Sequence, residues 1–137
     1  LGLVPGTMSD LHPLEKILRE RIAIIDGAMG TVIQLYWRPK GLGEEWFRGE
    51  RFKDWKGKDQ KGNNELLLLT QPQVIEEIHA SFLEVGCDAL ETNTFGGNRL
   101  KMEEYGLGEQ THALNVAAAR LARKDKPLEV ELEIDAA

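Results

Sequence analysis

Residues 22–31 read IAIIDGAMGT. Four apolar residues stand first, without alternation, which is typical of a strand buried on both faces in a parallel sheet. The glycines that follow let the backbone turn tightly and approach a ligand closely. Asp26 stands where the predicted strand ends, which is the ligand-binding end of a parallel sheet. The stretch therefore predicts a strand followed by a turn that carries a binding site.

The chain on either side extends this pattern. The further predicted elements, in chain order, are a helix over 11–21, a helix over 70–86, a strand over 87–95, a short helix ending at Gly106 and a helix over about 109–123. In the second of these helices Thr70 is the expected N-cap, with Gln73 completing a capping box and Gly86 ending the helix. Strands alternating with helices predict an α/β fold with parallel strands.

Two stretches depart from this pattern. Residues 41–61 are polar, aromatic and irregular, and a connection of that length inside a domain is usually functional or mobile. Near the C-terminus, apolar residues alternate with acidic ones over residues 128–134. Strict alternation describes a half-exposed strand, so we expect an edge strand or a frayed tail there. Residues 1–7 resemble a remnant of an expression vector and are left out of the fold prediction.

The composition excludes several classes of protein. The chain has 137 residues, a formal net charge of −6 and a single cysteine, Cys87. An acidic balance argues against nucleic acid as a partner, because binding of phosphates needs clustered Lys and Arg. The longest apolar runs, such as residues 66–69, have only four residues and are far too short to span a membrane, and the N-terminus lacks a signal-peptide pattern. A single cysteine fits a reducing compartment, so we expect a cytoplasmic protein without membrane or nucleic-acid partners.

The first candidate site is the turn that follows residues 22–25. The Asp26 carboxylate could hold an ammonium group, and the backbone amides of Gly27, Ala28 and Met29 could hold a carboxylate or a phosphate. Together these groups would suit an amino acid. The alternative is an ordinary turn between strand and helix, capped by Asp26.

The second candidate site is the segment ETNTF, residues 91–95. Polar side chains at the carboxyl end of a strand fit a binding site, and Asn93 and Thr94 are its candidates. The alternative is that both side chains only bind the loop backbone. A third motif, residues 62–64, reads GNN, and there the structural interpretation is favoured because Gly and Asn dominate turns. Cys87 lacks any partner at metal-ligand spacing and is expected to be a small buried residue.

Several of these segments, in this order, resemble the start of the cobalamin-dependent methionine synthases, a branch of the homocysteine S-methyltransferase family. The segments are residues 24–31, 47–52, 61–66, 70–72, 91–95 and 114–120. The Phe-Arg-Gly-Glu run that begins at Phe47 points to the cobalamin-dependent branch. Its relatives include the betaine-using homocysteine methyltransferases, which remain an alternative.

The resemblance implies a (β/α)₈ barrel that binds homocysteine at the carboxyl ends of its strands. Zinc held by three cysteines would bind the homocysteine sulfur as a thiolate, because a thiol with a pKa of about 8.5 is mostly protonated at pH 7. The methyl group would come from methylcobalamin, recharged from methyltetrahydrofolate on other modules of the enzyme. Within this chain, Asp26 would bind the ammonium, the amides of Gly27, Ala28 and Met29 the carboxylate, and Asn93 and Thr94 would line the pocket.

The resemblance also sets the expected extent of the domain. A complete barrel needs about 250 residues, so residues 8–123 would be its opening βα units, an incomplete barrel, and residues 124–137 a tail that does not match. The zinc cysteines would lie beyond this chain, and we expect the chain alone to be inactive. The alternatives are a non-catalytic binding module of the same fold and an unrelated α/β anion-binding domain.

Overall fold

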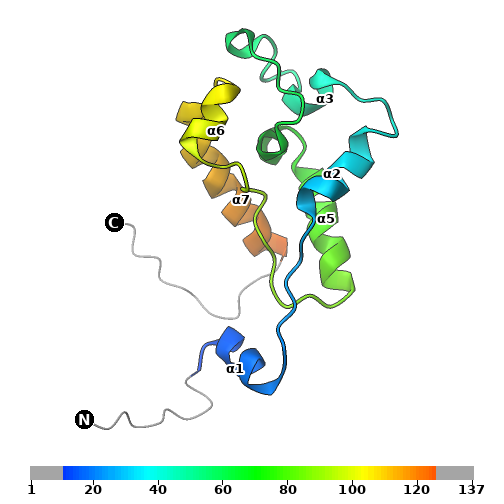
Figure 1. The fold of residues 1–137 in the computed structure, drawn as a ribbon, viewed down its shortest axis with the longest axis vertical. Coiled ribbons are helices and arrows are strands. Elements are labelled where there is room, and N and C mark those ends of the chain that lie inside the picture. Colours follow the sequence, from blue (N-terminus) through cyan, green and yellow to red (C-terminus); the bar gives the residue numbers. More distant parts are fainter. Residues whose placement is uncertain (1–10, 126–137) are drawn as a thin grey trace, which may run out of the picture.

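The structure is a computed structural model that describes residues 11–125. Its helices and 3-10 turns, in chain order, are α1 (Pro13–Glu20), α2 (Met29–Trp37), α3 (Glu44–Arg48), η2 (Trp55–Gly57), η3 (Asn64–Leu66), α4 (Leu67–Thr70), α5 (Pro72–Glu84), α6 (Arg99–Glu104), η4 (Gly108–Gln110) and α7 (Thr111–Asp125). Figure 1 shows α1 set apart from the others, and α1 buries none of its residues. The later helices therefore form the packed part of the molecule.

The main apolar core lies between helices. The buried face of α5 carries Val74, Ile75 and Ile78, which share one cluster with Ile33 of α2 and Ala118 of α7. The apolar stripe predicted on this helix is thus covered by other helices. Removing these side chains from water is the main favourable term that holds the helices together.

A second, smaller core lies where residues 52–66 meet the C-terminal helices. Its buried members are Phe52, Leu66, Met102, Leu107 and Leu114. At its edge the indole N–H of Trp55 donates to the carbonyl oxygen of Gly106 at 3.0 Å. This core ties residues 52–66 to α6 and α7.

The prediction of an α/β fold with the opening units of a barrel is wrong for the described residues. The two predicted strands meet only at one isolated parallel bridge, between Ile25 and Ala89. Strands of a parallel sheet need cover on both faces, but Ile24 and Ile25 are 57% and 58% exposed. The helices that would cover them pack against one another instead, so residues 11–125 contain no sheet.

The helix predictions fare better than the strands. Helices predicted over 11–21 and 109–123, and a short one ending before Gly106, are confirmed as α1, α7 and α6. The helix predicted over 70–86 is present as α5 but begins at Pro72. Its predicted capping box is wrong, because Thr70 belongs to α4 and its hydroxyl donates to the carbonyl oxygen of Phe47 at 2.7 Å.

Two further points concern the limits of the described part. The predicted tail strand over 128–134 and the first seven residues lie outside the residues that the structure describes. Among the helices within residues 11–125, none is long and apolar enough to cross a membrane.

Candidate functional site

The start of α2 offers backbone N–H groups to a ligand. Ala28, the residue before the helix, is left-handed with φ 55°, and no side chain caps the helix there. The N–H groups of Met29, Gly30 and Thr31 have no partner within the described residues. Unpaired N–H groups and the positive end of the helix dipole together favour an anion.

The segment 91–95 lies opposite this helix start. Its first residue, Glu91, is held through both its backbone N–H and its carbonyl oxygen. The N–H of Glu91 donates to Oδ1 of Asp26 at 2.5 Å. The carbonyl oxygen of Glu91 lies 3.3 Å from Nε2 of His79, a distance at which a protonated Nε2 donates to it. Asp26 is 5% exposed and His79 is fully buried. Two buried side chains therefore set where this segment begins.

The middle of the segment and the turn that follows it are held in the same way. The side-chain amide of Asn93 donates to the carbonyl oxygen of Asn64 at 2.8 Å. The N–H of Gly96 donates to Oε1 of Glu65 at 2.6 Å, and Asn115 of α7 donates to the carbonyl oxygen of Gly97 at 2.7 Å. The segment and the turn after it are therefore held by hydrogen bonds to residues from other parts of the chain.

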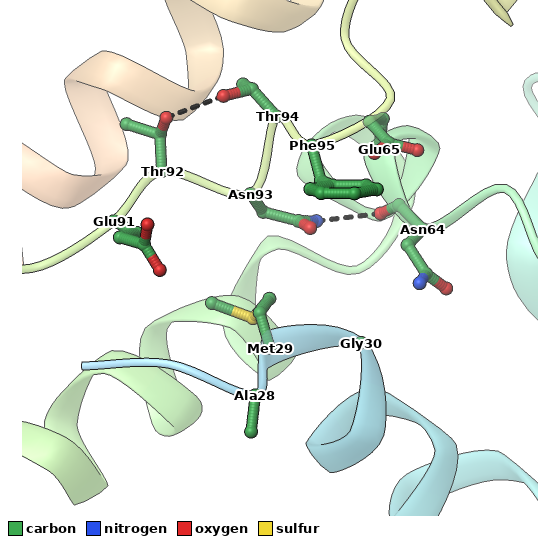
Figure 2. A pocket seen from close by; sticks show the side chains of 10 residues that line it. All are labelled: Ala28, Met29, Gly30, Asn64, Glu65, Glu91, Thr92, Asn93, Thr94 and Phe95. Atoms are coloured by element: carbon green, nitrogen blue, oxygen red, sulfur yellow. Dashed lines mark hydrogen bonds between the residues drawn. The ribbon is translucent and has the colours of Figure 1, made fainter.

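A pocket of about 560 Å³ lies between the start of α2 and this segment. Figure 2 shows the residues that line it, which are Ala28, Met29, Gly30, Asn64, Glu65, Glu91, Thr92, Asn93, Thr94 and Phe95. The lining contains two carboxylates and no Lys, Arg or His. The pocket thus combines unpaired N–H groups on one wall with carboxylates on the other, which suits a ligand carrying both charges.

The structure brings together four of the six residues predicted from the sequence. Ala28, Met29, Asn93 and Thr94 line the pocket from two segments far apart in the chain. Gly27 precedes the lining residues without being one of them. Asp26 also lies off the pocket wall, and one of its carboxylate oxygens accepts the N–H of Glu91.

The sequence analysis missed four polar residues of the lining, which are Asn64, Glu65, Glu91 and Thr92. Glu91 and Thr92 belong to the segment ETNTF, from which the sequence predicts only Asn93 and Thr94 as binding residues. Asn64 is the last residue of the GNN motif, for which a structural role is predicted, and Glu65 follows it. That interpretation suits Asn63, which is buried and whose Oδ1 accepts the N–H of Leu66 at 3.3 Å. Within this motif, Asn63 therefore stabilises the fold, while Asn64 lines the pocket.

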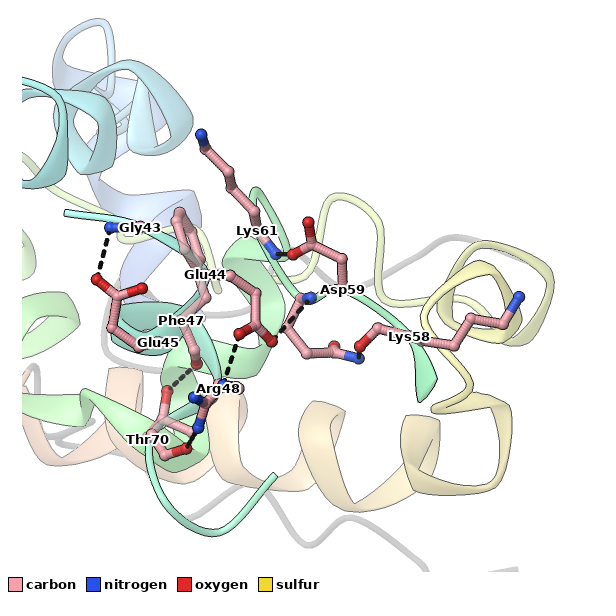
Figure 3. A network of polar contacts seen from close by, with 11 residues as sticks. Gly43, Glu44, Glu45, Phe47, Arg48, Lys58, Asp59, Lys61 and Thr70 are labelled. Carbon is pink, nitrogen blue, oxygen red and sulfur yellow. Dashed lines mark hydrogen bonds and ion pairs between the residues drawn. The ribbon is translucent and has the colours of Figure 1, made fainter. Parts of the chain in front are cut away.

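A second hollow, of about 360 Å³, lies beside α3. Figure 3 shows the polar contacts there, in which Nε of Arg48 donates to Glu44 at 2.5 Å. The hydrogen bond with Glu44 raises the pKa of Arg48. Arg48 also donates to the carbonyl oxygen of Gly49 at 2.9 Å. These contacts close within the chain and hold the turn after α3, so they indicate a structural role for this part of the Phe-Arg-Gly-Glu run.

The zinc implied by the resemblance finds no ligand set in the described part of the chain. No group of three or more His, Cys, Asp or Glu side chains there could hold a metal ion. Cys87 is 8% exposed and lies in the extended segment before Ala89. A zinc thiolate site needs several such ligands together, so no chemical step is assigned to zinc here.

Residues 23–127 match the profile of the homocysteine S-methyltransferase family. The match spans both walls of the pocket and most of the chain. The chain belongs to the homocysteine S-methyltransferase family, which is a family of methyltransferases. The alternative of an unrelated anion-binding domain is thereby excluded.

Proposed function

We propose that this chain is the homocysteine-binding part of a methionine synthase, in which methylcobalamin on another module donates the methyl group and methionine is formed. One observation carries the binding role. The pocket joins the unpaired N–H groups at the start of α2 to the polar segment 91–95 in a member of a homocysteine-using family. A zwitterionic amino acid has the two charges that these walls can bind.

The proposed arrangement assigns the amino-acid end of homocysteine to groups of this chain. Its carboxylate would accept hydrogen bonds from the amides of Met29 and Gly30, with those of Gly27 and Ala28 beside them. Hydrogen bonds to a charged group are roughly twice as strong as neutral ones. Asn93 and Thr94 would form the facing wall, and the anchored backbone keeps that wall in place before the substrate arrives.

The choice of methyl donor rests on the resemblance rather than on the pocket. The Phe-Arg-Gly-Glu run that begins at Phe47 favours the cobalamin-dependent branch over the betaine-using relatives. Methylcobalamin and methyltetrahydrofolate would then be partners carried by separate modules. Measuring methionine formation by the complete enzyme that carries this segment, with either methylcobalamin or betaine as the only methyl donor, would distinguish the two branches.

Calorimetric titration of the chain with L-homocysteine tests the proposed binding. We expect one site per chain and a dissociation constant between about 1 μM and 1 mM, the usual range for metabolites. Propanethiol, which lacks both charged groups, is the matched control ligand and should not bind measurably. Equal binding of the two thiols, or none of homocysteine, would refute the proposal.

We also expect the isolated chain to bind homocysteine without methylating it. The only cysteine in the sequence is Cys87, so three cysteine ligands for zinc are not available within it. Metal analysis after incubation with zinc should give well under one ion per chain, and added methylcobalamin should yield no methionine. Stoichiometric zinc together with turnover would contradict this expectation.

A further inference from the structure

Glu91 is the one carboxylate of the pocket lining that is not used by the fold. Its residue is exposed, and within residues 11–125 its side chain makes no hydrogen bond or ion pair, although its backbone makes two. Figure 2 shows the carboxylate extending from the segment 91–95 toward the start of α2. A free carboxylate on this wall is available to a ligand.

The other two acidic side chains near the pocket are already engaged. Oε1 of Glu65 accepts the N–H of Gly96 at 2.6 Å, and Glu65 is only 8% exposed. Oδ1 of Asp26 accepts the N–H of Glu91 at 2.5 Å, and Asp26 does not line the pocket. Of the three, Glu91 therefore has the most capacity to accept hydrogen bonds from an ammonium group.

The position of Glu91 is fixed before any ligand binds. Asp26 holds its N–H, and His79, fully buried on α5, holds its carbonyl oxygen. Because the backbone is already ordered, binding costs only the rotamer freedom of the Glu91 side chain and no further ordering of the backbone. Asp26 and His79 thus fix the backbone of Glu91 at the edge of the pocket.

We infer that Glu91 binds the α-ammonium group of the substrate and makes the site select α-amino acids, while Asp26 is a positioning residue that holds Glu91. The inference rests on the proposed homocysteine site and goes beyond it, because the ammonium was assigned to Asp26 from the sequence. Opposite charges on the two walls then fix the orientation of the ligand. The carboxylate lies at α2, the ammonium at Glu91, and the thiol end is left to point away from both.

The test compares L-homocysteine with 4-mercaptobutanoate, which has the same carboxylate and thiol but no ammonium. The measured quantity is the ratio of the two dissociation constants by calorimetry. In the wild-type chain homocysteine should bind more tightly. Glu91→Gln removes the charge from an exposed side chain, so we expect homocysteine to bind roughly 10- to 100-fold more weakly and 4-mercaptobutanoate to bind no more weakly than to wild type. Glu84→Gln, an exposed carboxylate at the end of α5, is the control and should change neither constant.

Asp26→Asn separates positioning from direct contact. Asparagine keeps an oxygen that accepts the N–H of Glu91, so this variant should retain the wild-type preference for homocysteine. An unchanged preference in Glu91→Gln, or its loss in Asp26→Asn alone, would overturn the inference and leave homocysteine binding intact. A wild-type chain that binds neither thiol would instead refute the proposed function, and the inference with it.

Discussion

Gly49 has a backbone conformation that only glycine adopts readily, with φ 53° and ψ −165°. It ends α3 and turns the chain so that Phe52, 2% exposed, enters the second core. A Cβ at this position meets no hard obstacle, since its nearest neighbours are atoms of Thr70 at 3.7 Å. The constraint is therefore on the backbone and not on the space around it.

Replacing Gly49 tests this reading of the turn. Gly49→Ala should lower the free energy of unfolding by about 1–3 kcal/mol, because alanine is strained at this φ and ψ. Gly27→Ala is the matched control, since nothing lies within 4 Å of a Cβ there and its φ is not positive. Urea unfolding followed by circular dichroism gives both values. Equal losses in the two variants would contradict a backbone origin.

Sequence reasoning at the residue scale anticipated part of the pocket lining for an identifiable reason. Ala28, Met29, Asn93 and Thr94 were predicted as binding residues, and the structure places them around one pocket. The first backbone N–H groups of any helix lack a partner inside the helix. Their presence can therefore be expected from a local sequence pattern. Whether the carboxylate of Glu91 or that of Asp26 is free for a ligand depends on which of them accepts hydrogen bonds within the fold. Those bonds join segments that are far apart in the sequence, so a local pattern does not predict them.

At the scale of elements, α5 is the centre of the packing. Its buried residues touch the same cluster as side chains of α2, α4 and α7. Ile78 is 1% exposed within that cluster. Because helices from four parts of the chain meet there, the cluster joins the start of α2 to the segment that follows α5.

Truncating Ile78 tests whether this cluster holds the fold together. Ile78→Ala should cost about 2–5 kcal/mol of unfolding free energy, from lost burial and the cavity left behind. Leu100→Ala is the control, because Leu100 is 86% exposed and exposed sites usually change stability by less than about 0.5 kcal/mol. Thermal unfolding of both variants checks the contrast. A loss for Ile78→Ala no larger than the control would show that the helices do not depend on this core.

The same scale explains why most of the predicted helices are confirmed and the two predicted strands are wrong. The spacing of Val74, Ile75 and Ile78 predicts a helix whatever covers that face. The apolar run at residues 22–25 indicates residues that can be buried, but not whether a second surface is present to cover them. In the structure α2 and α5 pack on each other. The run pairs with the second predicted strand at one isolated bridge, to Ala89, and makes hydrogen bonds with Asp88 through Ile24.

At the scale of the whole molecule, the pocket lies at a junction of three distant parts of the chain. Residues 28–30 begin α2, residues 64–65 begin η3, and residues 91–95 lead from the bridge at Ala89 toward α6. Ile33 of α2 belongs to the main core and Leu66 of η3 to the second core. Family membership over residues 23–127 covers all three.

The most direct test of this account maps homocysteine onto the chain by nuclear magnetic resonance. A ¹⁵N-labelled sample titrated with L-homocysteine should show its largest amide shifts at Met29 and Gly30 and along residues 91–95, saturating with one dissociation constant. The Glu84 amide, at the far end of α5, should stay unchanged. Shifts confined to other residues, or no shifts at millimolar homocysteine, would contradict the claim that this pocket is the homocysteine site.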